Sequence, residues 1–144
     1  MLPTINGEFG VVAEPELKFS GNGNAWLKVR GIAKDRVRDA GTGAWSDGDP
    51  LFIDIICNQG AENLFESIAK GDTIIVSGKL KQRTYEKDGE KRTVFEIRAD
   101  SVGVSVRWGI ARTVASIQAS TNTVANAEET LGATVITEQV EAPF

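Results

Sequence analysis

The chain contains no histidine, a single cysteine (Cys57) and no long apolar run. Without histidine, the commonest general base, the Ser–His and Cys–His nucleophile pairs and most zinc sites are excluded. A lone cysteine excludes intramolecular disulfides and cysteine-cluster zinc sites. A transmembrane helix would need about eighteen apolar residues, and the N-terminus lacks the basic start and apolar block of a secretory signal. We therefore expect an intracellular protein that is not an enzyme, with no cofactor, metal or membrane partner.

Charge is distributed unevenly along the 144 residues, which suffice for one substantial core. Residues 1–108 hold fifteen Lys/Arg and sixteen Asp/Glu, a net charge of −1. Residues 109–144 hold one cation and four anions, a net charge of −3. Because the basic residues cluster in the near-neutral body, the overall charge of −4 does not exclude a nucleic-acid partner.

The stretch from Lys79 to Arg98 predicts a β-hairpin, because Asp88-Gly89 is a two-residue turn in which glycine can take a positive φ. Strand alternation places four of its side chains on one face: Lys79, Lys81, Arg83 and Tyr85. Three cations followed by an aromatic ring suit a row of phosphates with a base on the ring. A solvated hairpin with scattered charge is the alternative.

Residues 25–34 repeat this pattern on a second predicted strand. Leu27, Val29 and Ala33 face one way. The opposite face carries an aromatic ring among cations: Trp26, Lys28, Arg30 and Lys34. The alternative is that Trp26 only covers an open sheet edge.

The other elements complete a small β protein. Further strands are predicted at residues 5–12, 51–57 and 72–78, and a helix at residues 61–70 ends before Gly71. Residues 35–49 are interpreted as a long loop or loose hairpin. The expected core includes Ile53, Ile55, Cys57, Phe95 and Ile97. Four or five strands with one helix between the third and fourth predict an all-β class and an OB-fold, a five-stranded antiparallel barrel.

The C-terminal part differs in composition. Residues 109–137 are rich in Ala, Thr, Val, Asn and Ser, which predicts a low-complexity, disordered linker. Ile110, Val114 and Ile117 have helical spacing, but their neighbours are poor helix formers. Residues 138–144 form an acidic tip that ends in Pro143-Phe144.

Several segments over residues 4–108 together resemble the bacterial and bacteriophage single-stranded DNA-binding proteins. Their order and spacing carry the resemblance, since none is diagnostic alone. They are Glu14-Pro15-Glu16-Leu17-Lys18-Phe19, Gly23-Asn24-Ala25, Asp39 to Trp45 with its Thr42-Gly43 turn, Phe52-Ile53-Asp54, Ala61-Glu62-Asn63, Lys70-Gly71-Asp72, Val76-Ser77-Gly78-Lys79-Leu80, the hairpin Gln82-Arg83-Thr84-Tyr85 to Lys91-Arg92-Thr93, and Val106-Arg107-Trp108.

The resemblance implies that residues 1–108 form an OB-fold domain that assembles as a homotetramer, sometimes a dimer. It also implies sequence-independent binding of single-stranded DNA during replication, recombination and repair. Phe52 and Tyr85 match positions at which the family stacks bases on aromatic rings. At two other such positions this chain has Asn58 and Val37, and Trp26 or Trp45 could supply the stacking that these residues cannot. The expected DNA-binding residues are Trp26, Lys28, Arg30, Phe52, Lys79, Lys81, Arg83 and Tyr85.

In the family, an acidic tip ending in Pro-Phe recruits replication and repair proteins. The corresponding residues here are Glu138, Glu141, Pro143 and Phe144, although the family's dense aspartate run is missing and an ordinary frayed terminus is the alternative. The resemblance places the protein in the cytoplasm, at the nucleoid, or in a host's cytoplasm if it is viral.

Two other functions compete with this interpretation. The departures at Asn58 and Val37 allow an OB-fold assembly module with weak nucleic-acid binding. An enzyme would have to use carboxylates such as Asp54, Asp72 and Asp100, yet each lies in a predicted strand or turn and no histidine accompanies them.

Overall fold

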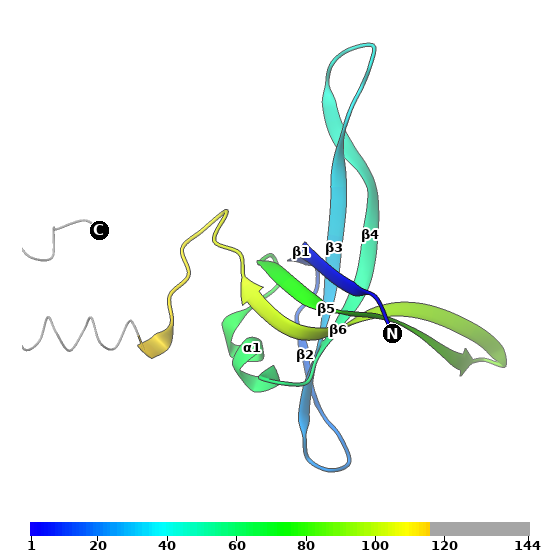
Figure 1. The fold of residues 1–144 in the computed structure, drawn as a ribbon, viewed down its shortest axis with the longest axis vertical. Helices are drawn as coiled ribbons and strands as arrows, with labels where there is room; N and C mark the ends of the chain where they lie inside the picture. Colours follow the sequence, from blue (N-terminus) through cyan, green and yellow to red (C-terminus); the bar gives the residue numbers. More distant parts are fainter. Residues whose placement is uncertain (116–144) are drawn as a thin grey trace, which may run out of the picture. The chain divides into compact units, whose positions relative to one another are not determined.

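The computed structural model describes residues 1–115 (Figure 1). The chain divides into a unit at Met1–Gly109, considered below, and a second that begins at Ile110. The acidic tip and most of the expected linker lie outside the described residues. The elements are β1 (Thr4–Val11), β2 (Glu16–Phe19), β3 (Ala25–Arg38), β4 (Trp45–Cys57), α1 (Ala61–Ser67), β5 (Thr73–Lys87) and β6 (Glu90–Val104).

The strands form one sheet that closes on itself. Its order is β1-β5-β6-β4-β3-β2, and a further pairing of β1 with β3 completes a ring. All pairings are antiparallel except that of β4 with β6. The helix lies between β4 and β5, as predicted. The all-β class with one short helix is therefore confirmed.

Strand alternation fills the inside of the ring. Six apolar side chains there are less than 2% exposed: Leu27, Val29, Ile55, Ile74, Val76 and Ile97. Cys57 is also buried, as predicted, and burial raises the pKa of its thiol. Phe95 was expected in the core but is 55% exposed. The reason is geometric: the pairing of β4 with β6 begins only at Asp54 and Glu96, and Phe95 precedes it.

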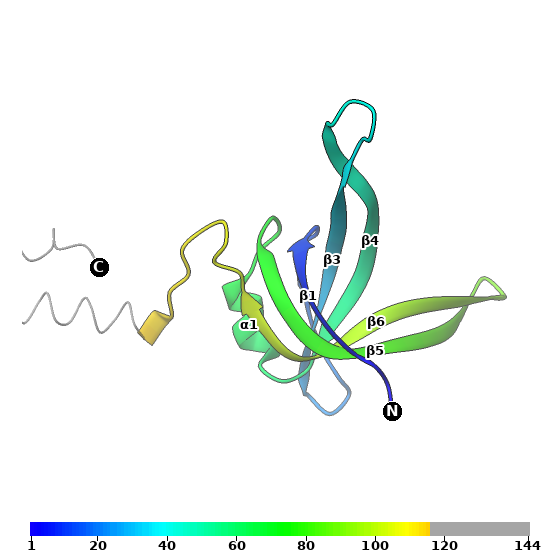
Figure 2. The same cartoon turned by 45° about the horizontal axis from the view of Figure 1, so that its top comes forward.

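Two long hairpins extend from the ring in different directions (Figures 1 and 2). We call them the β3–β4 arm and the β5–β6 arm. Residues 35–49, interpreted from the sequence as a long loop or loose hairpin, form the end of the first arm, because β3 continues to Arg38 and β4 begins at Trp45. The hairpin alternative is therefore the correct one. The second arm turns at Asp88 (φ 55°) and Gly89 (φ 77°), which confirms the predicted hairpin.

Two local features depart from expectation. The short strand β2 follows Pro15 and pairs only with β3. It was not predicted, because the proline before it indicates an interruption between strands and not the start of one. The helix ends at Ser67, three residues early, because the backbone of Ile68 is extended and its side chain packs into the core.

Candidate nucleic-acid interface

The outer face of the ring carries a charged surface across four strands. Strand register sets side chains from β3, β4, β6 and β5 beside one another in rows. One row consists of Arg30, Asp54, Glu96 and Lys81. The next consists of Lys28, Ile56, Arg98 and Lys79. Residues from separate parts of the sequence thus meet on one surface.

Each of the three rings selected from the sequence has a cation near its face. The Lys18 ammonium lies 5.4 Å from the ring centroid of Trp26. The guanidinium of Arg30 lies 5.6 Å from the centroid of Phe52, and that of Arg83 lies 5.3 Å from Tyr85. These are cation–π distances. A ring beside a cation can stack a base while the cation meets the adjoining phosphate.

A groove of about 440 Å³ lies on this face. Its lining combines residues of β2, β3, β4, β5 and β6 with Asn58: Lys18, Trp26, Lys28, Asp54, Ile56, Asn58, Arg83, Glu96 and Arg98. The structure therefore brings three of the predicted DNA-binding residues into one groove, namely Trp26, Lys28 and Arg83. We refer to it below as the basic groove.

Two carboxylates hold the cations in and beside the basic groove in place. Asp54 lies 3.1 Å from Arg30 and 3.8 Å from Lys28. Glu96 is only 3% exposed and lies 3.0 Å from Arg98 and 3.6 Å from Arg83. A buried carboxylate needs such partners. Since both guanidinium groups remain partly exposed, they can still reach a phosphate.

The remaining predicted residues lie outside the basic groove but on the same face. Arg30 and Phe52 line an apolar notch of about 400 Å³ with Leu51, Leu80, Val94 and Phe95 among its other residues. Lys79 donates a hydrogen bond to the Thr4 hydroxyl at 2.7 Å. Lys81 lies beside Glu96 in register, and Tyr85 lies opposite Arg92, farther along the β5–β6 arm.

Some residues of this face were missed from the sequence. Lys18 was missed because β2 was not predicted, and Arg98 because it lies on the second strand of the hairpin, where cations do not alternate as they do on the first. On the β3–β4 arm, the face that includes Lys34 continues past a register shift to Arg36, Arg38 and Trp45, which were not assigned to it from the sequence. Alternation of cations from residue 28 to residue 38 was the available signal, but the interpretation of residues 35–49 as a long loop or loose hairpin assigned Arg36 and Arg38 to no strand face.

Asp47 ties this arm together. Its carboxylate accepts hydrogen bonds from Lys34 at 2.7 Å and Arg36 at 3.4 Å. The hydrogen bond and charge of Lys34 lower the pKa of Asp47. At the tip, the backbone N–H groups of Thr42 and Gly41 donate to Asp39 and lower its pKa.

The structure distinguishes the two candidate replacements for missing rings. Leu27 of β3 pairs with Cys57 of β4, so the residues next to them, Trp26 and Asn58, lie across from each other. Both line the basic groove. Trp45 pairs with Arg38, whereas Val37 pairs with Ser46. Alternation therefore puts Trp45 and Val37 on opposite faces of the arm.

Within residues 1–115, no group of three or more His, Cys, Asp or Glu side chains is arranged to hold a metal ion. In the same part of the chain, no helix is long and apolar enough to cross a membrane.

Comparison with known proteins agrees with this geometry. The model of the "Single-strand binding protein family" matches residues 9–105. The single-stranded DNA-binding protein of Mycobacterium tuberculosis is 42% identical over 111 residues, covering 76% of this chain and 68% of the relative. That of Corynebacterium glutamicum is 45% identical over 100 residues, covering 68% of this chain and 44% of the relative.

Solved structures show the same fold. A small single-stranded DNA-binding protein from Streptomyces coelicolor superposes with a TM-score of 0.66 at 31% identity, covering 75% of this chain and 98% of that one. A Plasmodium falciparum SSB in complex with ssDNA gives a TM-score of 0.61 at 20% identity, covering 73% and 96%. This supports the expected OB-fold. By the extent of the family match and the identity to these relatives, the chain belongs to the single-strand binding protein family.

Proposed function

We propose that this protein binds single-stranded DNA without reading its sequence. The observation that carries the proposal is the set of three ring–cation pairs on one face, at Trp26, Phe52 and Tyr85. Every base has a π-face that can stack on a ring, and each neighbouring cation can meet the phosphate beside it. The chain's membership of a family of single-strand binding proteins also agrees with the expectation that it is not an enzyme.

The two arms extend the binding surface beyond the ring. Phosphates would follow the cations of the basic groove and continue along each arm. On the β3–β4 arm these are Lys34, Arg36 and Arg38, and on the β5–β6 arm Lys79, Lys81 and Arg83. Each phosphate contact releases counterions, so the affinity falls as the salt concentration rises. Tyr85 carries a large share of the stacking, because Asn58 and Val37 offer no ring.

Binding of this kind would protect single strands during replication, recombination and repair. A homotetramer in the cytoplasm, whether at a nucleoid or in a host cell, would let one strand pass over several copies of the face. The tip residues Glu138, Glu141, Pro143 and Phe144 would recruit replication and repair proteins through a terminal aromatic ring and nearby acids. The match of that tip to the family's ending supports this part.

The proposal is tested by titrating the protein with poly-dT and with duplex DNA while following tryptophan fluorescence. Strong quenching by poly-dT with little response to duplex is expected, because paired bases cannot expose their faces to Trp26. Equal affinity for the two forms would contradict the proposal. Measuring the mass in solution with and without oligo-dT tests the tetramer and gives the number of nucleotides bound.

The second candidate is an OB-fold assembly module that binds nucleic acid weakly. It is favoured by one observation, the absence of rings at Asn58 and Val37. This alternative predicts weak poly-dT binding even at low salt, where the proposed function predicts tight binding.

A further inference from the structure

Three carboxylates on the charged face of the ring and of the β3–β4 arm share one arrangement. Each lies between two cations and contacts each of them with a different oxygen atom. We call these groups ion triads. The first consists of Lys34, Asp47 and Arg36, the second of Lys28, Asp54 and Arg30, and the third of Arg83, Glu96 and Arg98.

Strand register explains why the arrangement repeats. Asp47 Oδ2 lies 2.7 Å from Lys34, and its Oδ1 lies 3.4 Å from Arg36. In the triad of Asp54 the two distances are 3.1 and 3.8 Å, and in that of Glu96 they are 3.0 and 3.6 Å. In the two triads on β3 and β4, the carboxylate lies directly opposite one cation and diagonal to another two residues earlier on β3, so it can reach both.

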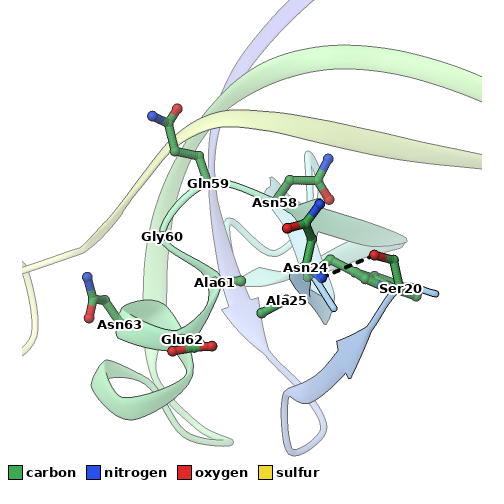
Figure 3. Close-up of a pocket in the computed structure, with 10 residues that line it drawn as sticks. Ser20, Asn24, Ala25, Asn58, Gln59, Gly60, Ala61, Glu62 and Asn63 are labelled. Atoms are coloured by element: carbon green, nitrogen blue, oxygen red, sulfur yellow. Dashed lines mark hydrogen bonds between the residues drawn. The ribbon is translucent and has the colours of Figure 1, made fainter. Parts of the chain in front are cut away.

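A carboxylate close to the basic groove is not placed in this way. Figure 3 shows a pocket of about 760 Å³ that is lined by Glu62 and shares Asn58 with the groove. The lining of this pocket contains no Lys or Arg, and within residues 1–115 Glu62 forms no ion pair. The ion triads therefore belong to the face that carries the cations and not to acidic residues in general.

The carboxylates halve the charge that the ion triads offer to DNA. Their six cations and three anions give a net charge of +3, where the cations alone would give +6. The six cationic side chains are between 36% and 64% exposed, so a phosphate can reach them. Each of these cations already has an anionic partner, so an incoming phosphate must share the cation with a carboxylate or displace it.

We propose that Asp47, Asp54 and Glu96 compete with the DNA phosphates for the cations of this face. They hold the cations in place in the free protein and keep the affinity for a strand below the value that the cations alone would give. A weaker electrostatic contact also depends less on salt and lets a bound strand be released. The inference rests on the proposed DNA-binding function and gives the acidic residues of the face a role of their own.

The experiment uses Asp47→Asn in the full chain, because the Asp47 side chain is 47% exposed and its replacement leaves Lys34 and Arg36 in contact with water. Affinity for oligo-dT is measured by fluorescence titration between about 0.1 M and about 1 M salt. One more positive charge available to phosphate should steepen the slope of log K against log salt by about 0.7. The variant should therefore bind about fivefold more tightly than wild type at about 0.1 M salt, with the difference vanishing near 1 M.

Asp49→Asn is the matched control. Asp49 lies two residues from Asp47 on the same strand, is exposed, and within residues 1–115 forms no ion pair. The two variants change the net charge by the same amount, so they differ in the ion pairs alone. Asp49→Asn should keep the wild-type slope. Equal steepening in both variants would attribute the effect to overall charge and would overturn the inference.

Two other results would overturn the inference. Weaker binding by Asp47→Asn would show that the carboxylate assists phosphate binding and does not compete with it, and an unchanged slope would show that it has no effect. Asp54→Asn, which repeats the test on the ring, should steepen the slope by the same amount. These results would leave the proposed function intact, whereas failure of the wild type to bind oligo-dT would contradict the proposed function itself.

Discussion

Arg83 and Tyr85 allow the phosphate and stacking contributions to DNA binding to be separated. The guanidinium of Arg83 lies 5.3 Å from the ring centroid, so it occupies one side of Tyr85 and leaves the other for a base. Tyr85→Ala removes a stacking platform worth about 1–3 kcal/mol, roughly a five- to 150-fold loss of affinity. Since no charge changes, the slope of log K against log salt should stay the same. Tyr85→Phe should retain most of the affinity.

Arg83→Gln should change the slope instead. Removing one phosphate contact on a single strand makes the slope shallower by about 0.7. The fold should tolerate the change, because Glu96 keeps its contact with Arg98 at 3.0 Å and is not left without a cation. Lys70→Gln is the matched control, since Lys70 is exposed and does not line the basic groove.

The assay for this pair is fluorescence titration with oligo-dT at four or more salt concentrations. Unchanged affinity in Tyr85→Ala would remove Tyr85 from the interface. A slope that flattens equally in Tyr85→Ala and Arg83→Gln would refute the division of roles between ring and cation. A flattened slope in Lys70→Gln would show that the effect reflects overall charge rather than a phosphate contact.

Three further predictions concern stability, thiol chemistry and pH. Gly78→Ala should lower the free energy of unfolding by about 1–3 kcal/mol in a denaturant titration, because its Cβ would lie 2.3 Å from the Arg98 carbonyl oxygen. Gly103→Ala is the control: its Cβ would have open space, so the free energy of unfolding should change little. Cys57 should react slowly with a thiol reagent until the protein unfolds, because it is buried and its pKa is raised; equal rates in the folded and denatured protein would contradict its burial. DNA affinity should stay constant between about pH 6 and about pH 8. The chain has no histidine, and because the pKa of Asp47 is lowered, its ion pairs with Lys34 and Arg36 are lost only in acid. A titration step in this range would show an ionisable contact not identified above.

The β3–β4 arm makes the interface larger than the sequence predicts. From the sequence, the basic surface consists of one hairpin and one strand of the ring. In the structure it includes a second arm, on which Lys34, Arg36 and Arg38 continue the face that begins at Lys28. The resulting surface spans both arms and the ring, which suits a flexible strand better than a compact ligand.

The sequence alone determined the local features of this protein. Alternation in residues 25–34 and 79–98 identified the two basic strands, and Asp88-Gly89 identified the turn. These are properties of neighbouring residues, and the strand period of two applies wherever a segment is extended. The absence of histidine likewise limited the chemistry before any fold was known. The class of fold and the cations Lys28 and Arg83 of the basic groove followed from such patterns.

Only the tertiary structure decided which of these residues meet. The basic groove joins Lys18, Lys28, Arg83 and Arg98 because β4 and β6 pair within the ring, where the two hairpins meet before they diverge. This pairing joins segments that are far apart in the sequence, Asp54 with Glu96. It also placed Phe95 outside the core, since alternation tells which face a residue lies on but not where strand pairing ends. The position of Trp26 beside Asn58 follows from register, which depends on the whole closed sheet rather than on either segment.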